Sequence, residues 1–168
     1  MEIDTIDDVM EDLYHSHARN IQRMCYLYLG NVAAAEDAMQ ETFLKAYEKY
    51  PHFRGKSDVK TWLTRIAINT CKDMQRRDAR KNKYVQQEME KTGQISTDTY
   101  ENSVDRILLA EAIRKLPGEL REVVILFYYQ ELSARSIAAI LRIPQTTVEF
   151  RLKKARSELK KVIREHSC

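Results

Sequence analysis

The sequence predicts an all-α protein built from two small helical domains joined by a flexible linker. Only four glycines and three prolines occur in 168 residues, while residues of high helix propensity are abundant. Apolar residues recur with a helical period over most of the chain. Residues 81–103 lack that period and are mostly polar, which is typical of a linker.

The expected first domain, residues 1–80, contains three helices. They are expected over residues 5–29, 32–50 and 59–77. Gly30 suits the end of the first helix, because glycine adopts a left-handed backbone easily. Pro51 ends the second. Either Ser57 or Asp58 caps the third.

Each of these helices is expected to bury one apolar face. In the second helix it comprises Ala35, Ala38, Met39, Phe43, Ala46 and Tyr47. In the third it comprises Val59, Trp62, Leu63, Ile66, Ala67, Thr70, Cys71 and Met74. Cys25 and Cys71 fall on such faces as small core residues. With Cys168 they are odd in number and far apart, so reduced thiols are expected rather than disulfides.

The expected second domain, residues 104–168, opens with a helix capped at Ser103. Pro117 and Gly118 separate it from a helix over residues 119–131, whose apolar run predicts the core of this domain. The pair Tyr128 and Tyr129 within that run is interpreted as packing rather than as a platform for bases.

Residues 133–156 have the pattern of a helix–turn–helix. Ser133 can cap a short apolar helix, Pro144 interrupts the pattern, and a second period resumes with Val148 and Leu152. The second helix carries the densest basic run of the chain, which favours insertion into a DNA major groove. The alternative is a solvated helix whose lysines and arginines serve solubility.

Charge is unevenly distributed although the net charge is only +3. Acidic residues predominate in residues 1–50, and basic residues predominate in 51–80 and 104–168, which are candidates for phosphate contact. The four scattered histidines and the solvated carboxylates form no catalytic or metal-ligand pattern, so we expect neither an enzyme nor a cofactor. The acidic start lacks the apolar run of a secretion signal, and a cytoplasmic protein is expected.

Three stretches together resemble the extracytoplasmic-function (ECF) sigma factors of bacterial RNA polymerase. They are AEDAMQETFLKAY at 35–47, KTWLTRIAINTCKDMQRR at 60–77 and the helix–turn–helix. The resemblance implies a sigma-two domain at 1–80 that docks on core polymerase and reads and melts the minus-ten element. It implies a sigma-four domain at 104–168 that reads the minus-thirty-five element.

The polymerase-binding motif of the family falls on the second helix. Asp37, Gln40, Glu41 and Leu44 lie there at i, i+3, i+4 and i+7, on a face opposite the buried one. An acidic, polar face with one exposed leucine suits docking on a basic helical partner. An ordinary solvated face is the alternative.

The resemblance places minus-ten recognition on the loop 52–58 and the third helix, where a flipped base needs a basic rim and stacking or hydrogen-bonding groups. Asn69 is the candidate for reading a base edge, and the basic residues are candidates for phosphates. The predicted set is Phe53, Arg54, Lys56, Ser57, Lys60, Arg65, Asn69, Lys72, Arg76 and Arg77.

The predicted minus-thirty-five set is Thr146, Thr147, Glu149, Phe150, Arg151, Lys153 and Lys154. Arg151 is the best candidate for a bidentate guanine contact. Glu149 either accepts from a cytosine amine or repels misplaced phosphate, and Phe150 can touch a thymine methyl. The family pattern has glycine where Arg142 stands, so a strained backbone or a different turn is expected there. Ser136 replaces a capping glutamate, which weakens the cap.

The expected function is that of a dissociable specificity subunit that binds core RNA polymerase and promoter DNA. The resemblance also implies transcription of stress-response genes and control by an anti-sigma factor, often membrane-bound. One alternative is a free-standing helix–turn–helix regulator that binds duplex DNA without polymerase. Another is a helical adaptor whose basic face binds an acidic protein.

Overall fold

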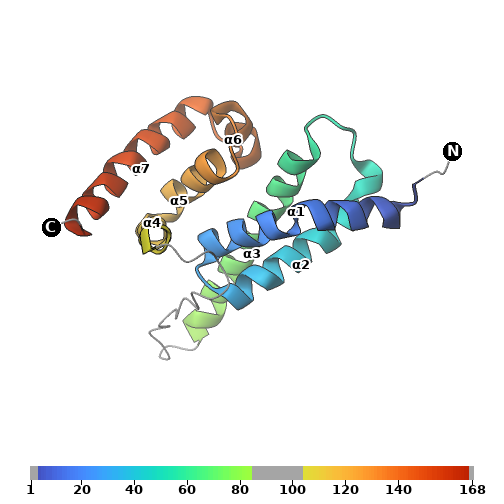
Figure 1. Cartoon of the computed structure of the whole chain (residues 1–168), viewed down its shortest axis with the longest axis horizontal. Helices are drawn as coiled ribbons and strands as arrows, with labels where there is room; N and C mark the ends of the chain where they lie inside the picture. Colours follow the sequence, from blue (N-terminus) through green and yellow to red (C-terminus); the bar gives the residue numbers. More distant parts are fainter. Residues whose placement is uncertain (1–3, 85–103, 167–168) are drawn as a thin grey trace. The chain divides into compact units, whose positions relative to one another are not determined.

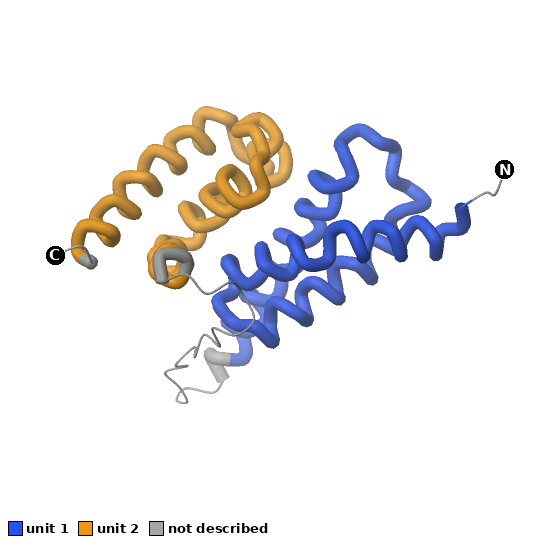
Figure 2. The backbone as a smooth tube through the Cα atoms, viewed as in Figure 1, with its two compact units in different colours: residues 1–95 blue, residues 96–168 orange. Residues whose placement is uncertain are grey.

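The computed structural model describes residues 4–84 and 104–166, and all regular elements within those ranges are helical (Figure 1). The chain divides into two compact units, residues 1–95 and 96–168 (Figure 2). The prediction of an all-α fold with two helical domains is therefore confirmed. Within the described ranges, no helix combines the length and the apolar character needed to cross a membrane.

Within residues 4–84, unit 1 contains three α-helices that pack against one another: α1 (Ile6–Leu29), α2 (Val32–Lys49) and α3 (Val59–Tyr84) (Figure 1). A capping box that sequence reasoning missed begins α1, where Thr5 Oγ1 accepts from the Asp8 amide and the Thr5 amide donates to Asp8. Gly30 ends α1 with φ of 73°, as predicted. The Asn31 side chain then caps α2.

The core of unit 1 combines large side chains with small ones that allow the helices to approach closely. Its buried members include Ile21, Met24, Cys25, Ala35, Ala38, Met39, Phe43, Ala46, Leu63, Ile66, Ala67, Ile68 and Cys71. The predicted burial of Cys25 and Cys71 is confirmed, and both are free thiols. Two causes raise the pKa of the Cys25 thiol well above its usual range: the larger is its hydrogen bond with Cys71, and the second is its burial. Cys168 lies outside the described residues.

Unit 1 differs from the prediction in three respects. Tyr47 is 44% exposed rather than buried, because its hydroxyl donates to Asp7 at the surface. Thr42 and Thr64 are buried although they are polar, since each hydroxyl donates to the carbonyl four residues earlier, at 2.6 and 2.7 Å. The helix α3 continues to Tyr84, into the segment predicted as linker, because no glycine or proline ends it sooner. The remainder of that segment, and Ser103, lie outside the described residues.

Unit 2 contains α4 (Val104–Lys115), α5 (Gly118–Val124), η2 (Ile125–Tyr129), α6 (Ala134–Leu141) and α7 (Gln145–His166) (Figure 1). Sequence reasoning predicted one helix over residues 119–131, but α5 changes after Val124 into the π-helix η2. A π-helix has a wider turn because its hydrogen bonds join residues five apart, and here the Gln130 amide donates to the Ile125 carbonyl at 3.1 Å. The run is nevertheless core, as predicted, with residues 123–126 buried.

The helix–turn–helix is formed by α6 and α7. Ser133 Oγ accepts from the Ser136 amide at 3.1 Å, which confirms the predicted cap. Ile137 and Ile140 of α6 are buried, as are Val148, Leu152 and Ala155 of α7. Arg142 joins the helices in the left-handed conformation, with φ of 58°. The sequence-based expectation of a strained backbone at Arg142 is thus met.

Replacing Arg142 with glycine is expected to stabilise unit 2 by about 0.5–1 kcal/mol. The left-handed conformation costs a non-glycine residue about 1–2 kcal/mol, part of which is offset by the greater freedom of glycine in the unfolded chain. Denaturant unfolding of the full chain, followed by circular dichroism, measures the change. Arg142→Ala is the control, because it removes the same side chain but keeps the strained backbone. An equal gain from alanine would show that strain is not the cause.

Candidate nucleic-acid and partner-binding surfaces

The outer face of α2 carries the residues predicted to bind polymerase. Asp37, Gln40 and Leu44 are exposed, and Leu44 has 67% of its surface accessible. An apolar side chain so open to water contributes little to the core of unit 1. Glu41 differs from the other three, because it is only partly exposed and its carboxylate has intramolecular partners.

A shallow apolar groove of about 370 Å³ lies beside Leu44. Its lining comprises Met10, Tyr14, Gln40, Phe43, Leu44 and Tyr47. The Tyr14 and Phe43 rings meet in an edge-to-face arrangement with centroids 5.1 Å apart. Sequence reasoning missed the groove because it assigned Tyr47 to the core. The signal available in the sequence was Tyr14, an aromatic residue off the apolar stripe of the first helix.

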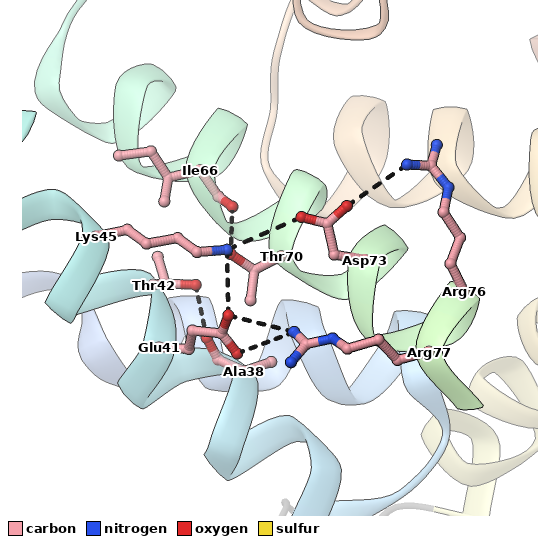
Figure 3. Close-up of polar contacts among 9 residues, drawn as sticks. All are labelled: Ala38, Glu41, Thr42, Lys45, Ile66, Thr70, Asp73, Arg76 and Arg77. Atoms are coloured by element: carbon pink, nitrogen blue, oxygen red, sulfur yellow. Dashed lines mark hydrogen bonds and ion pairs between the residues drawn. The ribbon is translucent and has the colours of Figure 1, made fainter. Parts of the chain in front are cut away.

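Glu41 belongs to a polar network that joins α2 to α3 (Figure 3). One of its oxygens lies 3.2 Å from Lys45 Nζ, and its two oxygens lie 3.3 and 3.5 Å from Arg77 Nη2. Lys45 also donates to Thr70 Oγ1 at 3.1 Å and lies 4.0 Å from Asp73. Arg77 is thus both a predicted phosphate contact and a partner of a predicted polymerase contact.

An aromatic cluster anchors the loop between α2 and α3, which begins with the short 3₁₀-helix η1 (Tyr50–His52). Phe53 packs on Trp62 with ring centroids 4.8 Å apart, and Tyr50 lies 6.2 Å from each ring. Phe53 and Trp62 are half-buried. Gly55, with φ of 68°, provides the bend of the loop. Phe53 therefore anchors the loop through its contacts with Trp62 and Tyr50.

Around this anchor, the predicted minus-ten residues are arranged on the loop and along α3. Arg54 and Lys56 of the loop are exposed, and Ser57 is half-buried. Four residues of α3 are spaced at i, i+4, i+7 and i+11, which places them in one stripe: Arg65, Asn69, Lys72 and Arg76. Lys72 is half-buried and the other three are exposed. Lys60 is half-buried near the start of the helix, and Arg77 is exposed beside the stripe.

Asp58, rather than Ser57, caps α3. Its Oδ1 accepts from the Thr61 amide at 2.7 Å. Hydrogen bonds to the backbone and side chain of Thr61 hold the pKa of the Asp58 carboxyl below its usual range. The cap fixes the start of the helix directly after the loop 52–58, so both parts of the predicted minus-ten surface depend on it.

Acid is expected to weaken this cap. Because its pKa is lowered in the folded protein, Asp58 stabilises unit 1 above its unfolded-state pKa, and the contribution is lost as pH falls through the folded-state pKa. Asp58→Asn keeps a capping oxygen that does not titrate. The difference in unfolding free energy between the natural chain and this variant should therefore shrink below about pH 4. Denaturant unfolding between pH 3 and pH 7 tests this, and a constant difference would contradict it.

The exposed face of α7 carries most of the predicted minus-thirty-five residues. Thr146, Glu149, Phe150, Lys153 and Lys154 are exposed, and Thr147 is half-buried. Phe150 is 65% accessible, although it is a large apolar residue. The Glu149 carboxylate accepts from Gln145 Nε2 at 3.2 Å, which orients it along the helix.

Arg151 does not share this face. Its side chain is only 19% exposed, and its guanidinium lies 3.7 Å from Glu119 and 3.9 Å from the buried Glu122, both on α5. A guanine contact would require the guanidinium to leave these carboxylates. The structure thus directs Arg151 of α7 toward α5, whereas Lys153 and Lys154 are the accessible cations of the predicted set.

A further basic residue that the predicted set omitted lies on α7. Arg156 Nε donates to the Tyr128 hydroxyl at 2.5 Å, and its guanidinium carbon lies 5.8 and 5.7 Å from the ring centroids of Phe127 and Tyr128. Tyr128 is 52% exposed, so this aromatic residue is at the surface. Arg156 is exposed and oriented, which suits it for binding a phosphate.

Comparison with known proteins matches both units. The Sigma-70 region 2 family matches residues 13–81, and the Sigma-70, region 4 family matches residues 106–159. The ECF RNA polymerase sigma factor SigW of Bacillus subtilis is 35% identical over 170 residues, covering 94% of this chain and 90% of SigW. The chain belongs to the ECF sigma factor family.

Other relatives agree. The ECF RNA polymerase sigma factor SigL of Mycobacterium tuberculosis is 34% identical to this sigma factor over 161 residues, covering 94% of this chain and 90% of SigL. Among solved structures, the sigma factor RpoE of Bartonella quintana, in complex with the anti-sigma factor NepR, matches with a TM-score of 0.82 at 24% identity. That match covers 94% of this chain and 98% of RpoE, and it supports the fold. Sigma factors are regulatory transcription initiation factors, and the predicted family is confirmed.

Proposed function

We propose that this sigma factor docks on core RNA polymerase through α2 and directs it to promoters of stress-response genes. The observation that carries the docking site is the outer face of α2, where Leu44 is exposed beside an apolar groove. Asp37 and Gln40 flank it with acidic and amide groups. This combination fits an amphipathic helix that brings an apolar anchor and basic neighbours.

The two DNA-binding surfaces are proposed to bind different promoter elements. The loop 52–58 and the stripe on α3 hold the opened minus-ten strand, and the exposed face of α7 enters the major groove at the minus-thirty-five element. Residues 1–80 form the first domain, 81–103 the linker and 104–168 the second domain in this proposal. The factor performs no chemistry itself and works in the cytoplasm.

An anti-sigma factor, free or membrane-bound, is proposed to hold this sigma factor inactive. The match to RpoE supports this proposal, because RpoE was crystallised in complex with the anti-sigma factor NepR. The exposed apolar groove on α2 offers such an inhibitor a surface where it would also exclude polymerase.

Run-off transcription and strand opening test the proposal. Genomic promoter fragments from the source organism are incubated with the purified chain, with core polymerase, and with both. Promoter-specific opening is expected only with both, and Asp37→Ala or Gln40→Ala should reduce it. Tight binding of duplex DNA by the chain alone, without an effect on initiation, would indicate a free-standing regulator instead. An absence of any DNA dependence would indicate an adaptor.

A further inference from the structure

The polar network between α2 and α3 alternates in charge along its length (Figure 3). Going from Arg77, the successive partners are Glu41, Lys45, Asp73 and Arg76. Two of these cations, Arg76 and Arg77, belong to the proposed DNA surface, and each is paired with a carboxylate of the same unit. The carboxylate that faces Arg77 comes from the proposed docking helix.

The ion pair between Glu41 and Arg77 is exposed enough to dissociate when another charge competes for either member. Arg77 is 57% exposed and Glu41 is 34% exposed at their side chains, so solvent reaches both members. A single guanidinium nitrogen, Nη2, approaches both carboxylate oxygens, at 3.3 and 3.5 Å, which is a weaker arrangement than a bidentate pair formed by two guanidinium nitrogens. An exposed pair of this kind contributes little stability, so an outside charge can replace either partner.

A DNA phosphate and Glu41 are rival acceptors for the same donor of Arg77. While Arg77 donates to Glu41, its positive charge is partly neutralised and that donor is occupied. A partner that binds the Glu41 carboxylate ends this competition and makes the Arg77 donor available to a phosphate. Since Glu41 projects from α2, the proposed polymerase surface, docking can provide such a partner.

We propose that Glu41 withholds Arg77 from DNA in the free sigma factor, and that docking of α2 on polymerase releases it. Glu41 is therefore a positioning residue rather than a simple docking contact. Lys45 keeps Glu41 in place from the adjacent turn of α2. The inference rests on the proposed function, because it requires both polymerase docking and phosphate contact by Arg77.

The test compares two variants that each remove one negative charge from α2. Glu41→Gln loses the pair with Arg77, whereas Glu48→Gln changes an exposed residue for which no ion pair is found among the described residues. Binding of a fluorescent single-stranded oligonucleotide to the full chain is measured by anisotropy at low salt. The series is repeated with Arg77→Gln, alone and combined with Glu41→Gln. All are then measured with promoter DNA at saturating core polymerase, and melting curves confirm folding.

In the free chain, Glu41→Gln is expected to bind about two- to fivefold more tightly than Glu48→Gln, the factor that corresponds to an exposed ion pair. This gain should vanish in the Arg77→Gln background and at saturating polymerase. Equal affinities of the two variants, a gain that survives Arg77→Gln, or the same gain in the holoenzyme would each overturn the inference. Each of these results would leave transcription by the natural chain intact, which separates the inference from the proposed function.

Discussion

Replacing Leu44 with aspartate is expected to weaken binding to core polymerase by about 30-fold or more, without unfolding unit 1. Burying a leucine in an interface contributes about 1.5–3 kcal/mol, and the aspartate would in addition place a charge in an apolar contact. A loss of about 2 kcal/mol corresponds to about 30-fold in affinity. Because the side chain is 67% exposed in the free protein, the melting temperature should hardly change. Fluorescence titration of labelled sigma factor with core enzyme measures the affinity.

Leu44→Met is the matched control, because methionine keeps an apolar side chain of similar volume. It should retain most of the affinity and most of the run-off transcription. If the aspartate variant bound polymerase as tightly as the natural chain, the outer face of α2 would be an ordinary solvated surface. The docking site would then have to be sought on another part of the molecule.

Replacing Arg151 with alanine is expected to destabilise unit 2 by about 1–3 kcal/mol, because the buried carboxylate of Glu122 loses a nearby cation. A stability loss of this size is a large fraction of the total for a unit of about 70 residues. Minus-thirty-five recognition should then fall for all promoter sequences alike. Urea unfolding gives the stability, and run-off competition among promoters with altered minus-thirty-five bases gives the specificity.

Lys153→Ala provides the contrast, since it removes an equal charge from the exposed face of the same helix. It should leave the unfolding free energy unchanged while weakening DNA binding. The sequence-based hypothesis of a guanine contact by Arg151 makes the opposite prediction for Arg151→Ala: unchanged stability and an altered preference at one base pair. That result would show that Arg151 contacts a base, as the sequence-based hypothesis holds.

The helices and the two-domain organisation could be predicted from the sequence because their signals are local. Gly30, Pro51 and Ser133 act within a turn of their own position, and the apolar periods of the helices follow from burial. The family could be recognised for the same reason, because the motifs that define it are contiguous stretches of the sequence.

The properties that could not be predicted depend on partners distant in the chain. Arg151 and Lys153 are both basic residues of one helix, and only the position of Glu119 and Glu122 separates a support from an exposed cation. In the same way, the apolar character of Tyr47 predicted burial, but a hydrogen bond to Asp7, forty residues away, keeps the ring at the surface. Periodicity identifies a face of a helix without identifying what lies opposite it.

The π-helix η2 is equivalent to an α-helix with one residue inserted, and this has a consequence for the evolution of unit 2. Each residue of an α-helix advances the chain by about 100° of rotation. The wider turn absorbs the extra residue, so the chain on either side keeps the phase of a continuous α-helix. Deleting one residue within 125–129 would therefore restore α-helical geometry without rotating the chain that follows. Deleting one residue near the start of α7 would instead rotate the rest of that helix by the full turn of about 100° and carry Arg156 away from Tyr128. Single-residue deletions should therefore be better tolerated in η2 than in α7.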